Sequence, residues 1–313
     1  MVRSFRVMYF GTPQFAVPTL ERLLGSSHPV VGVVTQPDRP RGRGQHVTAS
    51  PVKVVAEAHG VPVLQPTQLR DAAFLDSVRD LAPDIGVVAA YGRILPQALL
   101  DLPAHGMVNV HASLLPRWRG AAPIHRAVIA GDTVTGVTIM RVVLALDAGP
   151  MLARTEVPIT SGDTSESLEP QLASAGADLL VATLDRLAAG PVTEVPQDEA
   201  QVTYAERLQR SESVVVWTRS AVEIDRQIRG LQPWPLAVVT IGDRRVALLR
   251  SAVVASNATA TPGTIIRAAG DDLHIATSDG VVAITQLKPE GRRPMPVRDW
   301  LNGVPITPGT VVA

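Results

Sequence analysis

The stretch Met107-Val108-Asn109-Val110-His111 is a short apolar run that carries two polar side chains near its end. Its length and its valines are typical of a strand buried in a sheet. Because successive side chains of a strand alternate between its two faces, Asn109 and His111 project from the same face. Ligands of open α/β sheets bind beyond the carboxyl ends of the strands. The stretch therefore predicts a carboxamide and an imidazole together at the ligand-binding edge of a sheet.

The first half of the chain alternates apolar runs with helical patterns, which indicates βαβ units and a Rossmann-like α/β fold with a mostly parallel sheet. Ser50 followed by Pro51 predicts a helix start, because serine is a preferred N-cap and proline fits the first helical position. The predicted strands span residues 6–10, 30–35, 84–91, 107–111, 135–143 and 151–157, and the predicted helices span 14–24, 50–59, 95–102, 124–130 and 165–189.

The pattern changes after Gly190-Pro191. Residues 191–206 have few periodic apolar positions and predict a connector, and 214–231 predict one or two helices. Short β-rich runs separated by turns then predict a small antiparallel OB-like barrel. We expect a first domain of residues 1–190, a linker of 191–206 and a C-terminal β-barrel domain of 207–313. The predicted barrel strands span 237–241, 246–249, 263–267, 273–277 and 281–287.

Composition narrows the class of protein. The 313 residues are 46% hydrophobic, which suggests about two domains with sizeable cores. Cysteine is absent, which excludes disulfides, thiolate zinc sites and thiol nucleophiles. No segment resembles a secretory signal or a membrane span, so we expect a cytoplasmic protein without membrane contact. Residues 207–313 carry 13 Lys and Arg against 9 Asp and Glu, a weak indication of a polyanionic partner.

Two common kinds of cofactor site are disfavoured. Gly11-Thr12-Pro13 follows the first predicted strand, where a dinucleotide fingerprint would lie, but the Gly-x-Gly-x-x-Gly pattern is absent and Pro13 removes a backbone donor. The histidines do not have the spacing of metal ligands, so we expect no metal site.

Residues 37–46 form a loop rich in arginine, proline and glycine that joins the second predicted strand to the helix at Ser50. Arg39, Arg41 and Arg43 have few apolar neighbours in this loop. A mobile loop of this kind either orders on a phosphate backbone or is a solvated surface loop. The sequence of the loop is compatible with both interpretations.

Asp147 is the candidate acidic partner of Asn109 and His111. It follows the strand predicted at 135–143, which we expect to neighbour the strand of His111 and to end on the same ligand-binding side of the sheet. An Asn–His–Asp set without a serine or cysteine nucleophile suits direct acyl or formyl transfer between two substrates, because amide and imidazole groups stabilise an oxyanion and the carboxylate accepts a proton. The alternative for His111 is a purely structural histidine.

Residues 109–124, Asn-Val-His-Ala-Ser-Leu-Leu-Pro-Arg-Trp-Arg-Gly-Ala-Ala-Pro-Ile, closely resemble the signature of the methionyl-tRNA formyltransferase family. The resemblance extends over essentially the whole chain. It includes residues 10–13, 35–40, 50–53, 135–140, 146–147, 263–265, 276–277 and 279–280.

The resemblance implies transfer of a formyl group from 10-formyltetrahydrofolate to the amino group of methionine on initiator methionyl-tRNA, for translation initiation. It also implies the formyltransferase fold, with tRNA contacts from the C-terminal domain. The residues at matching positions are Asn109, His111 and Asp147 for catalysis; Ser113, Leu114, Leu115, Pro116, Val88, Tyr91, Gly92 and Leu95 for folate; and Phe15, Arg39, Arg41 and Arg43 for the methionyl-tRNA.

The family pattern usually has glycine at the position of Ala145, threonine at that of Ala148 and an acidic residue at that of Pro150. Two alternatives are a folate-dependent formyltransferase that acts on a sugar nucleotide or other small amine, and a non-catalytic RNA-binding protein on the same scaffold. The arginine-rich loop and the basic C-terminal part favour tRNA. We also expect the chain to act as a monomer.

Overall fold

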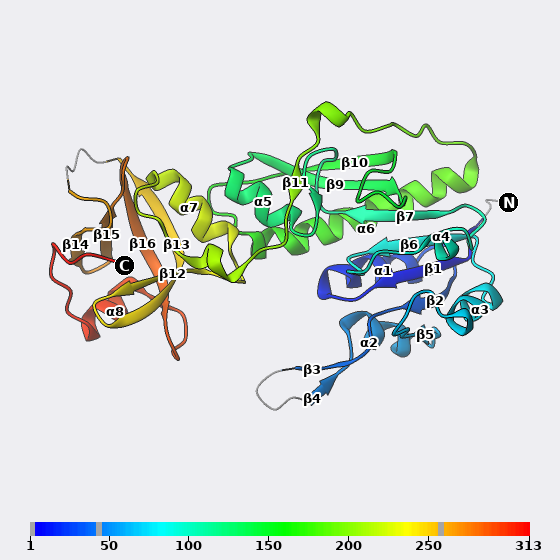
Figure 1. Ribbon diagram of the computed structural model, residues 1–313, viewed down its shortest axis with the longest axis horizontal. Coiled ribbons are helices and arrows are strands. Elements are labelled where there is room, and N and C mark those ends of the chain that lie inside the picture. The colour runs from blue at the N-terminus through cyan, green and yellow to red at the C-terminus, as the bar shows by residue number, and fades with distance from the viewer. Residues whose placement is uncertain (1–3, 42–45, 256–259) are drawn as a thin grey trace. The chain divides into compact units, whose positions relative to one another are not determined.

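The computed structural model describes residues 4–41, 46–255 and 260–313 (Figure 1). The chain divides into two compact units that each contain a sheet. The first unit comprises Met1–Pro123, Val134–Pro158 and Glu169–Ala205, and the second comprises Ile124–Thr133, Ile159–Leu168 and Glu206–Ala313.

The first unit has a seven-stranded sheet with the order β10-β9-β7-β6-β1-β2-β5 (Figure 1). Strands β7, β6, β1, β2 and β5 are parallel, whereas β9 is antiparallel to β7 and β10 is antiparallel to β9. The sheet is therefore Rossmann-like and mostly parallel, as the sequence predicts. The strands are β1 (Val7–Gly11), β2 (Val30–Val34), β5 (Val63–Leu64), β6 (Ile85–Ala89), β7 (Met107–His111), β9 (Val134–Arg141) and β10 (Met151–Pro158).

Helix α2 begins at the serine that the sequence predicts as its N-cap. Ser50 accepts a hydrogen bond from the Lys53 backbone N–H (3.1 Å), so the predicted N-cap is present. Helix α3 is absent from the sequence prediction because it buries only Phe74 and Val78. The helices are η1 (Gln14–Ala16), α1 (Val17–Leu24), α2 (Pro51–Ala58), α3 (Ala72–Asp80), α4 (Gln97–Leu100), α5 (Pro123–Ala130) and α6 (Ser165–Ala189).

The arginine-rich loop has strand pairing at both ends. β3 (Arg39–Arg41) pairs with β4 (His46–Thr48) in antiparallel register, with Arg39 opposite Thr48. The expectation of an irregular loop is therefore wrong for these ends. Pro40 is tolerated because a two-stranded ribbon consists only of edge strands. Residues 42–45, which include Arg43, lie outside the described residues.

The second unit has an antiparallel sheet with the order β12-β13-β16-β15-β14, and β17 pairs with β16. Bridges join Ile241 to Val312 and Thr264 to Val311, so the last residues of the chain link both ends of the sheet. The strands are β12 (Ala237–Ile241), β13 (Arg244–Val254), β14 (Ile265–Ala269), β15 (Asp272–Ala276), β16 (Val281–Pro289) and β17 (Met295–Pro296), and the helices are η3 (Arg210–Ser213), α7 (Ala221–Gly230) and α8 (Val297–Gly303).

One apolar core fills this unit. It includes Trp217, Ile224, Leu248 and Trp300, which come from the segment before α7, from α7, from β13 and from α8. No helix within the described parts of the chain is long and apolar enough to cross a membrane.

Gly136 in β9 tests how tightly the first sheet is packed. A Cβ at this position would lie 2.0 Å from the Thr155 carbonyl oxygen and 2.6 Å from Leu114 Cδ2, so Gly136→Ala should lower the free energy of unfolding by about 1–3 kcal/mol. Gly190→Ala is the matched control, because nothing lies within 4 Å of its added Cβ. Thermal unfolding of the full chain checks this, and equal midpoints for the two variants would contradict it.

Candidate active site

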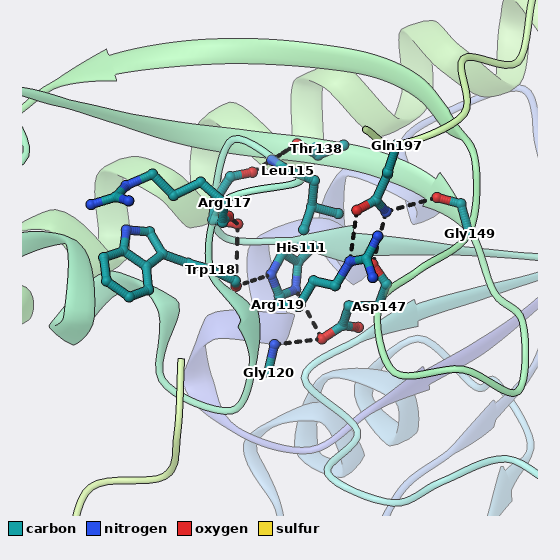
Figure 2. A network of polar contacts seen from close by, with 11 residues as sticks. His111, Leu115, Arg117, Trp118, Arg119, Gly120, Thr138, Asp147, Gly149 and Gln197 are labelled. Atoms are coloured by element: carbon teal, nitrogen blue, oxygen red, sulfur yellow. Dashed lines mark hydrogen bonds and ion pairs between the residues drawn. The ribbon is translucent and has the colours of Figure 1, made fainter. Parts of the chain in front are cut away.

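His111 and Asp147 face each other in the first unit (Figure 2). The distance between His111 Nδ1 and Asp147 Oδ2 is 3.8 Å, and the side chains are only 7% and 16% exposed. The Val110 side chain faces Gly176 of α6. Because side chains alternate along a strand, Asn109 and His111 project from the other face of β7. The predicted proximity of His111 and Asp147 is therefore present in the structure.

Asp147 reaches His111 by a route that the sequence did not predict. Strand β9 is antiparallel to β7, with Thr138 opposite His111 and Arg141 opposite Val108. The end of β9 therefore lies toward the amino end of β7, and residues 142–150 return to the carboxyl end. The expectation that Asp147 follows a strand end on the ligand side is wrong, because it assumed that β9 has the direction of β7.

The backbone of Trp118 determines which nitrogen of His111 carries a proton. His111 Nε2 lies 2.8 Å from the Trp118 carbonyl oxygen, which can only accept a hydrogen bond (Figure 2). In a neutral imidazole, Nδ1 then presents its lone pair toward Asp147, whereas an imidazolium donates from both nitrogens. The 3.8 Å gap to Asp147 exceeds a hydrogen-bond length, so Nδ1 is not hydrogen-bonded to this carboxylate.

The Asp147 carboxylate is held on one side only. Its Oδ2 accepts a hydrogen bond from the Gly120 N–H (2.9 Å). Among the described residues, none donates to Oδ1 or hydrogen-bonds to the carboxamide of the partly buried Asn109. Oδ1, the Asn109 carboxamide and His111 Nδ1 are therefore polar groups that a bound substrate can use.

Thr138 and Ser113 shape the loop that follows β7. The Thr138 hydroxyl donates to the Ser113 carbonyl (2.7 Å) and accepts from the Leu115 N–H (3.1 Å). The Ser113 hydroxyl donates to the Arg117 carbonyl (2.7 Å). Leu115 is fully buried against Met140 and Met151. The Ser113 and Leu115 side chains therefore stabilise the loop.

The other expected folate residues lie along β6 and after it. Val88 is partly exposed and pairs with Asn109 in the neighbouring strand. Tyr91 and Leu95 are buried in the apolar core, and burial raises the pKa of the Tyr91 phenol. Gly92 is exposed and has a φ of 76°. Leu114 and Pro116 are partly buried.

The expected methionyl-tRNA residues follow β1 and β2. These strands are parallel to β7 and end at the same edge of the sheet. Phe15 is buried in η1 after β1, and Arg39 is exposed in β3 after β2. Arg41 also lies in β3, and Arg43 lies outside the described residues.

An ion pair holds the base of the β3–β4 hairpin. Lys53 Nζ lies 2.6 Å from Asp38 Oδ2, and Gln65 bridges the two groups at 2.8–2.9 Å. The hydrogen bond from Lys53 lowers the pKa of Asp38, and the carboxylate raises the pKa of Lys53. The residue before Arg39 is therefore fixed to α2.

The sequence did not predict the roles of Arg119 and Gln197. The Arg119 Nε donates to Gln197 Oε1 (2.8 Å), and Gln197 Nε2 donates to the carbonyl oxygens of Asp147 and Gly149 (both 2.8 Å) (Figure 2). Gln197 belongs to the predicted linker, where no local pattern marks it. Within the described chain, no three His, Asp or Glu side chains gather as a metal site would require.

Two family models match the chain. The model described as "Formyl transferase" matches residues 4–184, and "Formyl transferase, C-terminal domain" matches residues 207–305.

Solved structures with the same fold have low sequence identity. HypX from Aquifex aeolicus in complex with tetrahydrofolic acid is 16% identical with a TM-score of 0.64, and the match covers 95% of this chain but 47% of that chain. The chain thus spans about half the length of the HypX chains that it matches.

Two shorter proteins match as well. An N-formyltransferase from Helicobacter canadensis, in complex with folinic acid and dTDP-3-aminofucose, is 18% identical (TM-score 0.68; 89% of this chain and 98% of that chain covered). A phosphoribosylglycinamide formyltransferase from Bacillus halodurans is 26% identical (TM-score 0.50; 58% and 94% covered).

Thr138→Val tests the support of the loop. The variant removes both hydrogen bonds of the hydroxyl and should lower the free energy of unfolding by about 1–3 kcal/mol. Thr135→Val in the same strand is the control, because within the described residues the buried Thr135 hydroxyl has no hydrogen-bond partner. Thermal unfolding should show a lower midpoint for the first variant only, and equal losses would contradict this account.

Proposed function

The chain belongs to the formyl transferase family, and we propose that it transfers a formyl group from 10-formyltetrahydrofolate to the amino group of methionine on initiator methionyl-tRNA. The observation that carries the proposal is the proximity of His111 and Asp147. His111 projects from the same face of β7 as Asn109, and these residues have polar atoms that are available to substrates. This arrangement suits direct transfer between two bound substrates, because it contains a proton acceptor and oxyanion-stabilising groups.

In the proposed reaction, the methionyl amine attacks the formyl carbon and a tetrahedral oxyanion forms. The Asn109 carboxamide and the protonated Nδ1 of His111 donate hydrogen bonds to this oxyanion. The negative charge of Asp147 stabilises the imidazolium, and Oδ1 accepts the proton that the amine loses. The bond from the formyl carbon to folate N10 then breaks, and N10 takes up the proton from the Asp147 carboxyl, which becomes a carboxylate again.

A folate donor fits the polar backbone at this edge. Ala90 and Gly92 after β6 are exposed and have φ values of 46° and 76°, so their peptide groups are not part of the sheet. We propose that peptide groups between Val88 and Leu95 bind the pterin, and that residues 113–116 line the rest of the folate site. HypX and the Helicobacter enzyme were solved with tetrahydrofolic and folinic acid, which supports this donor class.

Unpaired cations support a tRNA acceptor. Within the described part of the second unit, the exposed side chains of Arg250, Lys288, Arg292 and Arg293 have no acidic partner. Other exposed arginines of this unit, such as Arg298 beside Asp271, are paired. Unpaired cations are more available to a phosphate backbone. We propose that residues 207–313 and the arginines of the β3–β4 hairpin bind the tRNA.

A small amine is the second candidate acceptor, because the Helicobacter structure holds an aminosugar nucleotide. The test offers methionyl initiator tRNA and an aminosugar nucleotide separately, each with 10-formyltetrahydrofolate. Formyl-methionine on tRNA as the main product supports the first proposal. Efficient formylation of the sugar amine alone would replace it with the second.

Asp147→Asn tests the catalytic assignment. The amide keeps the size of the side chain but cannot accept the proton, so turnover should fall roughly 10²–10⁴-fold. Single-turnover formylation measures this, with thermal unfolding and donor binding as controls. Unchanged turnover in a folded variant that binds the donor would refute the role of Asp147.

Arg41→Ala combined with Arg43→Ala tests the hairpin. Loss of two phosphate contacts should weaken tRNA binding and reduce the slope of log K against log salt by about 2. Arg79→Ala on α3 removes the same kind of charge from an exposed ion pair with Asp76 and serves as the control. An unchanged slope in the double variant would leave the hairpin as a solvated surface feature.

A further inference from the structure

The Asp147 turn has an unusual backbone. Asp147 has a φ of 47°, a left-handed conformation that a residue with a side chain adopts at a cost. The backbone hydrogen bond across the turn, from the Ala148 N–H to the Ala145 carbonyl, is long at 3.4 Å. Contacts from outside the turn are therefore needed to hold this conformation.

Gln197 supplies such contacts to both sides of Ala148. Its two N–H groups donate to the carbonyl oxygens of Asp147 and Gly149, and its oxygen accepts from Arg119 (Figure 2). If the amide were flipped, its oxygen would face the two carbonyl oxygens and its N–H groups would face the Arg119 N–H. The three partners therefore determine the orientation of the amide. Gln197 is only 9% exposed, and hydrogen bonds are stronger where water is excluded.

The connector holds the carboxylate of Asp147 as well as its backbone. Arg119 is 3% exposed and also pairs with Glu199 (2.8 and 3.3 Å). Arg119 and Gly120 form β8 (Arg119–Gly120), which pairs with β11 (Tyr204–Ala205) of the connector. Gly120 then donates its N–H to Asp147 Oδ2. The residues predicted as a linker are therefore part of the support of the site.

We propose that Gln197 is a positioning residue that sets the place of the Asp147 carboxylate relative to His111. Without its amide, the carbonyls of Asp147 and Gly149 lose their donor, and the turn relaxes away from its left-handed conformation. The inference rests on the proposed formyl transfer, because it concerns the carboxylate to which that reaction assigns the proton.

Gln197→Met keeps the length of the side chain but removes both donors. We expect kcat for formyl transfer to fall about 10- to 100-fold, since small misplacements of a reacting group have effects of this size. The KM for 10-formyltetrahydrofolate should stay within about twofold, because folate contacts are not altered. Gln201→Met is the matched control, since Gln201 is exposed in η2 (Glu199–Gln201) and bonds only Asp198 among the described residues.

The same substitution in an Asp147→Asn background separates positioning from general stability. If Gln197 acts through Asp147, Gln197→Met should change the already reduced rate by less than about twofold. A loss of equal size in both backgrounds, or no loss in the wild-type background, overturns the proposal. If Gln197→Met does not fold, Gln197→Glu takes its place, because it keeps an acceptor for Arg119 and still opposes oxygen to both carbonyls.

A second measurement tests the role of Gln197 without relying on enzymatic activity. A wild-type chain that formylates no tested amine would refute formyl transfer, and amide hydrogen exchange of the peptide containing Gly120 would then decide on Gln197. Faster exchange in Gln197→Met than in Gln201→Met supports the proposal, because the Gly120 N–H depends on the place of Asp147 Oδ2. Equal exchange in the two variants overturns it.

Discussion

The loop between β9 and β10 must hold a carboxylate next to an imidazole that lies opposite Thr138, in the middle of β9, and the rest of the site is arranged around this requirement. A mostly buried carboxylate needs hydrogen-bond donors, which it finds in the Gly120 N–H. Gln197 holds the backbone on either side of Ala148. Residues far apart in the chain thus converge on one turn.

Most side chains around this turn are used for structure, which leaves a small set of polar groups for chemistry. The hydroxyls of Thr138 and Ser113 donate hydrogen bonds to carbonyls of the loop, and Leu115 packs in the apolar core. The Trp118 carbonyl occupies one nitrogen of His111. Hydrogen bonds thus hold the loop in place, while other polar atoms are left for substrates.

Local signals in the sequence predicted much of the first unit. The strand at residues 107–111, the shared face of Asn109 and His111, and the Ser50 cap depend only on neighbouring residues, and the structure contains all three. Helix α3 was missed because only two of its residues, Phe74 and Val78, are buried. The pairing of β3 with β4, and the link from the last residues to Ile241 and Thr264, depend on contacts that no local pattern encodes.

The sequence by itself determined the class of fold, the strand that carries the imidazole, and Asp147 as a candidate acidic partner, because periodicity and short motifs are local properties. The tertiary structure alone decided that β9 runs against β7, that the Trp118 carbonyl selects the protonated nitrogen of His111, and that the connector supports the site. Gln197 is 50 residues from Asp147 and 78 from Arg119. Hydrogen bonds over such separations arise only when the chain has packed, since each needs both partners at a specific distance and angle.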